Sequence, residues 1–121
     1  MTQQELKGKI EDNTIDDSPL ILKFVDNDFI CMQYAKTIAK NKGLKIVDIA
    51  ELSELDDIQD DTNIFDAKPE YLYLYKVDDL TGKVKESYKN LIVICKKMSS
   101  NNNDINYVDI ASLVNWQIEE F

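Results

Sequence analysis

The feature that most constrains this chain is a set of strand-length runs in which almost every residue is apolar. Residues 20–25 read Leu-Ile-Leu-Lys-Phe-Val, and residues 90–95 read Asn-Leu-Ile-Val-Ile-Cys. Continuous apolar runs are typical of strands that are covered on both faces, as in parallel sheets. Residues 71–77 alternate tyrosine with leucine, which predicts a third strand whose tyrosines lie on the wetter face.

Helices are expected between these strands. Residues 29–42 place Ile30, Tyr34 and Ile38 on one side of a helix, with Asp28 as its N-cap and Gly43 as its C-cap. Further elements are strands at 44–49 and 107–110, a polar helix capped by Thr2, a loosely helical acidic stretch at 51–61, and a helix with Trp116 at 112–121. This alternation predicts one α/β domain over residues 1–121, a three-layer sandwich with a mainly parallel five-stranded sheet.

The charge balance excludes several classes of function. The 121 residues include 14 lysines, no arginine, no histidine and 23 acidic residues, for a net charge of −9. Without histidine, the commonest general base and the commonest zinc ligand are missing. Without arginine, the chain has no bidentate phosphate clamp. The negative charge opposes binding to nucleic acid or to anionic membranes.

The two cysteines, Cys31 and Cys95, are too few and too far apart for a disulfide framework or a zinc site. Both lie in apolar surroundings, so we expect buried, reduced thiols, as in a cytoplasmic protein. The N-terminus is polar and unlike a signal peptide, and the longest apolar run is far too short to span a bilayer.

In parallel sheets, ligands bind beyond the carboxyl ends of the strands. The first such turn, residues 25–29, reads Val-Asp-Asn-Asp-Phe. A phosphate-binding loop needs glycines and a lysine there, so nucleotide binding is not expected. Asp78 and Asp79 follow the tyrosine strand like a decayed Walker B segment, and we interpret them as a solvated turn. Lys96 and Lys97 follow the next apolar run at the same edge.

One alternative rests on the acidic first turn. An apolar strand, Asp26 and Asp28 and an amphipathic helix resemble the start of a response-regulator receiver domain, in which the two acids bind a metal. The expected phosphoacceptor position, however, holds Tyr75 or Lys76 rather than aspartate. A second alternative is a small acidic protein-binding module, such as a DNA mimic.

The order of several segments resembles the N-terminal domain of the clamp loader delta subunit, the bacterial and phage DNA polymerase III delta family. Residues 19–30 are similar to its first strand, Asn-Asp turn and first long helix. Residues 62–66, Thr-Asn-Ile-Phe-Asp, are similar to its Ser-Leu-Phe element, and residues 71–79, 90–97 and 107–121 are similar to its later strands and last helix. The resemblance covers nearly the whole chain, with Asn63 and Ile64 in place of the usual Ser and Leu.

The resemblance implies a degenerate AAA+/RecA-like fold without a phosphate loop, and a protein that is not an enzyme. It implies no catalytic residue, no metal and no cofactor. Its partner would be the sliding clamp (beta clamp), bound through Ile64 and Phe65 to help open the ring, with other clamp loader subunits as further partners. The family's lid and collar domains are not expected in this chain. On the residues alone, Ile64 and Phe65 are expected to fold inward and cap the local core, because isolated apolar residues in loops are usually buried.

Overall fold

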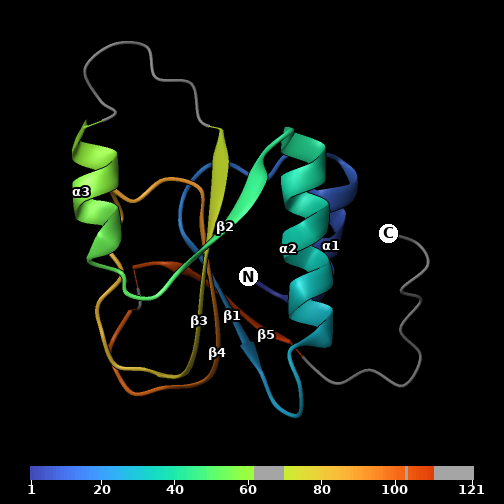
Figure 1. Cartoon of the computed structure of the whole chain (residues 1–121). Helices are drawn as coiled ribbons and strands as arrows, with labels where there is room; N and C mark the ends of the chain where they lie inside the picture. Colours follow the sequence, from blue (N-terminus) through green and yellow to red (C-terminus); the bar gives the residue numbers. More distant parts are fainter. Residues whose placement is uncertain (62–69, 103, 111–121) are drawn as a thin grey trace.

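The computed structural model describes residues 1–61, 70–102 and 104–110. Along the chain the elements are α1 (Gln3–Glu11), β1 (Leu20–Phe24), α2 (Phe29–Lys42), β2 (Lys45–Ile49), α3 (Glu54–Asp61), β3 (Tyr71–Leu80), β4 (Leu91–Met98) and β5 (Asn106–Ile110) (Figure 1). The helix expected at residues 112–121, with Trp116, lies outside the described residues. Within the described part of the chain, no helix has the length and apolar character needed to cross a membrane.

The five strands form one sheet in the order β2-β3-β4-β1-β5, and every neighbouring pair is parallel. Strand β1 is an interior strand, with Leu22 beside Ile94 of β4 on one side and Val108 of β5 on the other. Helices α1 and α2 lie on one side of the sheet and α3 lies on the other (Figure 1). The predicted α/β architecture with a five-stranded parallel sheet is therefore confirmed.

One face of the sheet, here called the helical face, packs against α1 and α2. Its core contains fully buried side chains from both helices, among them Leu6 and Tyr34. The buried strand residues on this face are Leu20, Leu22, Leu72, Leu74, Ile92, Ile94, Val108 and Ile110. The apolar periodicity read from residues 29–42 is confirmed, because Tyr34, Ile38 and the small residues beside them point into this core.

The opposite face, here called the loop face, packs against α3 and the two connections at residues 81–90 and 99–105. Its core combines strand residues with Leu55 of α3 and with Val84 and Tyr88 of the first connection. The buried strand residues on this face are Ile21, Ile49, Leu80, Leu91, Val93 and Cys95. Among the residues that the structure describes, this face is therefore covered by one short helix and by irregular chain.

The ends of the helices follow the sequence closely, with one exception. Thr2 and Glu5 form a complete capping box at the start of α1. Gly43 ends α2 with a φ of 70°, the left-handed conformation that glycine adopts without strain. Asp28 holds the N-cap position of α2, but its side chain does not cap the helix. Instead, the Phe29 N–H donates to Asn27 Oδ1 at 3.0 Å.

Strands β3 and β4 are both longer than the sequence indicates. Asp78 and Asp79 lie inside β3 rather than in a turn, which corrects the interpretation of these acids as a solvated turn. The Asp79 carboxylate accepts hydrogen bonds from the Ser99 N–H at 3.1 Å and from Ser99 Oγ at 2.8 Å. The predicted alternation is confirmed, since the side chains of Leu72 and Leu74 are buried whereas the neighbouring tyrosines are partly exposed.

Candidate functional site

The carboxyl-terminal edge of the sheet between β1 and β4 is the topological switch point of this fold. After β1 the chain crosses the helical face through α2, whereas after β4 it crosses the loop face through residues 99–105. In open α/β sheets the crevice at such a point is the usual ligand site. It is therefore the first place to look for a nucleotide or a metal.

At this edge, the turn between β1 and α2 makes two contacts within the chain. The residues between β1 and α2 include no glycine. The Asn27 carboxamide binds the Phe29 N–H, one of the free donors with which a helix N-terminus would bind an anion. The Asp28 carboxylate pairs with Lys76 Nζ of β3 at 2.9 Å. Asn27 and Asp28 are thus both engaged in contacts within the chain.

The two acids of the receiver alternative do not form a metal centre. Asp28 is committed to Lys76, and among the residues that the structure describes no three Cys, Asp or Glu side chains gather as metal ligands. The strand order is also different. Flavodoxin-like receiver domains place the first strand between the second and third, whereas here it lies between the fourth and fifth. The receiver alternative therefore lacks both its site and its topology.

Ile64 and Phe65, the residues that the resemblance assigns to clamp binding, lie outside the described residues. The described chain on either side consists of α3, which ends at Asp61, and β3, which begins at Tyr71. In Figure 1 the end of α3 and the start of β3 lie at the amino-terminal edge of the sheet, opposite the α2 N-terminus. The structure describes the contacts that hold α3 against the sheet.

Helix α3 is anchored through its first turn. Leu55 is fully buried in the core of the loop face. The Glu54 carboxylate accepts hydrogen bonds from the backbone N–H groups of Ala50 and Glu51 at 2.6 and 2.7 Å, which fixes the chain as it enters the helix. An isolated helix of eight residues is not stable in water, so these tertiary contacts are what keep α3 formed.

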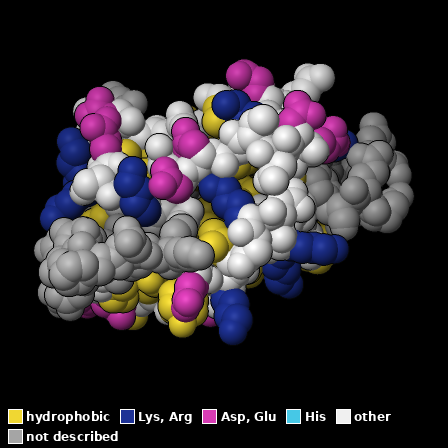
Figure 2. Space-filling view, turned by 90° about the horizontal axis from the view of Figure 1, so that it is seen from above, with side chains coloured by type: hydrophobic (Ala, Val, Ile, Leu, Met, Phe, Trp, Pro, Cys, Tyr) yellow, Lys and Arg dark blue, Asp and Glu magenta, His cyan; other side chains and the backbone are white. Residues whose placement is uncertain are grey.

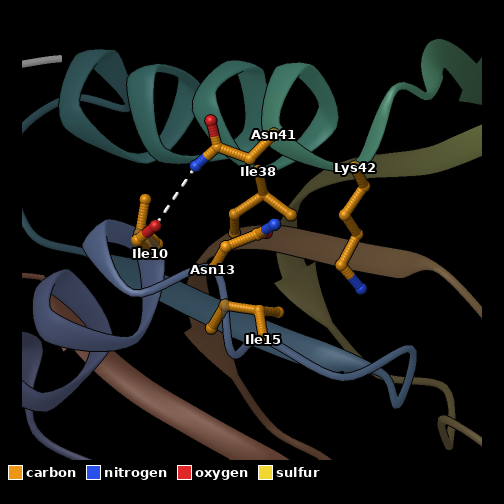
Figure 3. Close-up of a pocket in the computed structure, with 6 residues that line it drawn as sticks. All are labelled: Ile10, Asn13, Ile15, Ile38, Asn41 and Lys42. Atoms are coloured by element: carbon orange, nitrogen blue, oxygen red, sulfur yellow. Dashed lines mark hydrogen bonds between the residues drawn. The ribbon is translucent and has the colours of Figure 1, made fainter.

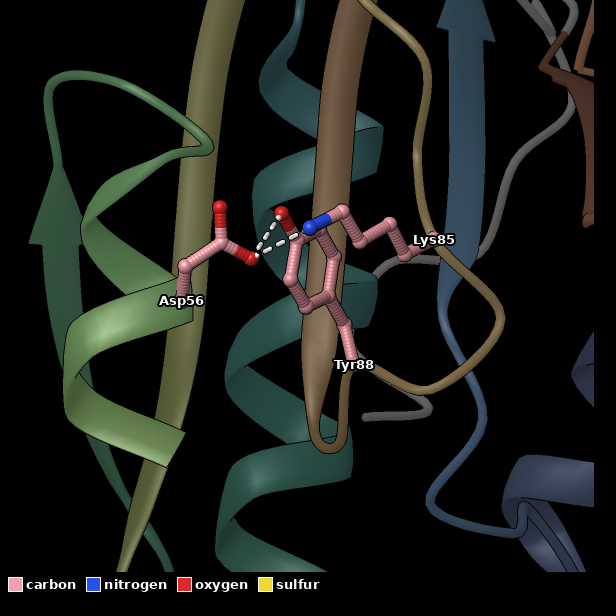
Figure 4. Close-up of polar contacts among 3 residues, drawn as sticks. All are labelled: Asp56, Lys85 and Tyr88. Atoms are coloured by element: carbon pink, nitrogen blue, oxygen red, sulfur yellow. Dashed lines mark hydrogen bonds and ion pairs between the residues drawn. The ribbon is translucent and has the colours of Figure 1, made fainter. Parts of the chain in front are cut away.

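The third anchor of α3 is the Asp56 clip, the name used here for Asp56, Lys85 and Tyr88. Asp56 Oδ1 accepts from Lys85 Nζ at 2.8 Å and from the Tyr88 hydroxyl at 3.0 Å (Figure 4). Hydrogen bonds from Lys85 and Tyr88 lower the pKa of Asp56, while burial and the Asp56 carboxylate raise the pKa of Tyr88. The Lys85 ammonium also lies 5.8 Å from the centre of the Tyr88 ring.

Sequence reasoning missed this clip. Asp56 is 29 residues from Lys85 and 32 residues from Tyr88, so no local spacing brings them together. One signal was available: Tyr88 is a large aromatic residue in an otherwise polar connection, and such a residue is usually buried with its hydroxyl bonded. In the structure Tyr88 is 4% exposed.

Exposed apolar side chains gather at the carboxyl-terminal edge instead. Val25 is 65% exposed and Phe29 is 49% exposed, and both flank the Asp26 to Asp28 turn. Figure 2, which views the molecule from above and therefore from the amino-terminal edge of the sheet, shows charges of both signs interspersed on that opposite edge. Val25 and Phe29 therefore provide an exposed apolar pair far from α3, which is useful as a control below.

A shallow pocket lies between the ends of α1 and α2 (Figure 3). It encloses about 150 Å³, including space open to solvent, which is below the usual size of a small-molecule site. Its polar groups are occupied: Asn41 Nδ2 donates to the Ile10 carbonyl at 3.1 Å, and Lys42 Nζ donates to the Asp16 carbonyl at 2.7 Å. This pocket links two helices and offers little to a ligand.

Both cysteines are free and buried, as expected from the sequence. Burial raises the pKa of Cys31 to about 12 and that of Cys95 to about 11. A nucleophilic cysteine needs a lowered pKa and access to solvent, so neither thiol fits that role.

Comparisons with known proteins do not identify the chain. No protein-family model, no curated protein and no solved structure matches it. Support for a function therefore comes from the sheet topology and from the contacts of the described side chains.

Proposed function

We propose that this chain is a non-catalytic DNA replication module that binds a sliding clamp and helps to open the ring, like the N-terminal domain of a clamp loader delta subunit. The observation that carries the proposal is the strand order, with β1 between β4 and β5. AAA+ and RecA-like nucleotide-binding cores share this arrangement. The proposed fold is thus a degenerate member of that class.

The state of the switch point supports the same proposal. In a nucleotide-binding core the turn after the first strand would hold phosphate, whereas here Asn27 binds the free N–H of α2 and Asp28 pairs with Lys76. A nucleotide-type sheet without a nucleotide site is suited to a role in protein contact. The delta subunits that the sequence resembles combine these two properties.

In this proposal, Ile64 and Phe65 bind a pocket on the clamp. Burial of two large apolar side chains in a partner contributes about 3–5 kcal/mol before the cost of ordering the segment. An aromatic anchor such as Phe65 is typical of an interface hot spot. Other clamp loader subunits are further partners in this proposal.

The test is calorimetric titration of the chain with a sliding clamp. We expect the wild-type chain to bind and the Ile64→Ala/Phe65→Ala variant to bind roughly 100-fold more weakly or not at all. The matched control is Val25→Ala/Phe29→Ala, which removes an exposed apolar pair at the opposite edge and is expected to bind like the wild type. A wild-type chain that does not bind at tens of micromolar, or a control variant that loses binding equally, would overturn the proposal.

A further inference from the structure

We infer that Asp56 is a positioning residue for clamp binding: its bonds to Lys85 and Tyr88 fix the direction of α3, the helix that precedes Ile64 and Phe65 in the sequence. The inference rests on the proposed function and deepens it. It concerns the side chains of Asp56, Lys85 and Tyr88 and helix α3, to which Asp56 belongs.

The first step is the location of the anchors of α3. Glu54, Leu55 and Asp56 are consecutive and lie in the first turn. From this turn the helix extends to Asp61, about 10 Å further along its axis. A rotation of about 20° at the first turn therefore displaces the end of the helix, where the chain leaves toward residues 62–69, by about 3 Å.

The second step is the distinct role of each anchor. Leu55 supplies apolar burial, which is non-directional and leaves the helix free to rotate about it. Glu54 binds backbone that precedes the helix. Asp56 alone of these three binds a separate part of the chain, the β3–β4 connection, through two directional bonds to one oxygen.

The third step is the rigidity of the partner. Tyr88 is almost fully buried, and its N–H donates to the Lys85 carbonyl at 3.1 Å, so that the two side chains of the clip leave one tight turn. Val84, next to Lys85, donates its N–H to the buried Asn102 side chain at 2.8 Å. The clip therefore connects α3 to a fixed part of the loop face rather than to a mobile loop tip.

Loss of the clip should lower the fraction of molecules in which α3 has the binding direction. The apparent affinity falls in proportion to that fraction, so a drop to one tenth weakens binding about tenfold. We expect Asp56→Asn, which removes the ion pair, and Tyr88→Phe, which removes only the hydroxyl, to weaken clamp binding by about threefold to tenfold each. Dissociation should accelerate less than association slows, because the contact itself is unchanged.

The matched control is Asp28→Asn. It makes the same chemical change in another aspartate–lysine pair, Asp28 with Lys76 at 2.9 Å, beside the start of α2. It alters the net charge equally, so any general electrostatic effect on clamp association appears in both variants. We expect its clamp affinity to equal that of the wild type.

The experiment measures clamp affinity by calorimetry and amide hydrogen exchange of the free chain, for the wild type and all three variants. The inference predicts weaker binding and faster exchange in α3 for Asp56→Asn and Tyr88→Phe, with unchanged exchange in β4. Equal affinity of Asp56→Asn and the wild type would overturn it, as would faster exchange throughout β1 and β4, which would mean a loss of the fold. A wild-type chain that does not bind the clamp overturns the proposed function instead. The hydrogen-exchange rates then test only whether the clip holds α3.

Discussion

The two faces of the sheet are held in different ways. On the helical face, α1 and α2 bury apolar side chains such as Leu6 and Tyr34 against the strands. On the loop face, a layer of buried strand residues of similar character is covered by one eight-residue helix and two connections. Polar contacts fix that cover: the Asp56 clip, the Asn102 side chain and the Asp79–Ser99 pair. The comparison teaches that packed helices cover one face of the sheet, whereas on the other face polar contacts fix connections that have no regular structure.

The largest effect should come from matched core deletions on the two faces. Ile21 and Leu22 are adjacent in β1, both fully buried, and they point to opposite faces. Leu22→Ala should cost about 3–5 kcal/mol and Ile21→Ala about 2–4 kcal/mol, because irregular cover collapses into a cavity more easily than packed helices do. Urea unfolding of both variants checks this. A clearly larger loss of unfolding free energy for Ile21→Ala than for Leu22→Ala would contradict the proposed difference between the two faces.

The next effect concerns the polar contacts of the loop face. Asn102 is 2% exposed, and its side chain accepts from the Val84 N–H and donates to the Gly82 carbonyl and to Ser100 Oγ. Asn102→Ala leaves the buried Val84 N–H without its partner and should cost about 1–3 kcal/mol. Asn106→Ala, at an exposed position, serves as the control in thermal unfolding and should stay within about 0.5 kcal/mol. Equal losses of stability in the two variants would show that the hydrogen bonds of Asn102 do not stabilise the loop face.

The labelling rates of the two cysteines measure how readily each face of the sheet opens. Cys31 lies in the core of the helical face and Cys95 in that of the loop face, and both are fully buried. Burial raises both pKa values above 10, so thiol labelling requires local opening. We expect Cys95 to react roughly tenfold faster than Cys31, which corresponds to about 1.4 kcal/mol in opening free energy. Alkylation followed by peptide mass spectrometry measures both rates, and a faster Cys31 would contradict the comparison.

The smallest effect is expected at the switch point. The Asp28–Lys76 pair is short, but both side chains are substantially exposed, at 35% and 47%. Such pairs contribute about 0–1 kcal/mol, and less at high salt. A double-mutant cycle with Asp28→Ala and Lys76→Ala should therefore give a coupling below about 1 kcal/mol. A much larger coupling energy would mean that this ion pair contributes to the stability of the fold as strongly as the contacts on the two faces.

The parts of the fold that depend on local pattern could be predicted from the sequence. The 3.6-residue periodicity that includes Tyr34 and Ile38, the glycine at position 43 and the apolar runs all act over a few residues. The extra length of β3 could not be predicted in this way. Asp78 and Asp79 are poor strand residues, and β3 continues through them because β4 pairs alongside and Ser99 binds Asp79.

The strand order and the Asp56 clip depend on contacts between distant parts of the chain. No local signal places β1 between β4 and β5. Tyr88 indicates its own burial, but Asp56 looks like an ordinary residue of a polar stretch until the fold brings the two together. The prediction of Ile64 and Phe65 came from the order of segments, and it remains a prediction because these residues lie outside the described chain.

The most direct test of the account is an NMR titration of the ¹⁵N-labelled chain with two probes, magnesium-ATP and a sliding clamp. The central claim is that a nucleotide-type sheet acts here through protein contact and not through nucleotide. The account predicts that the clamp attenuates amide signals in α3 and at Tyr71, and that magnesium-ATP leaves the signals of Asp26 to Phe29 and of Lys76 unchanged. Saturable shifts at Asp28 and Phe29 with magnesium-ATP, together with no response to the clamp, would contradict it.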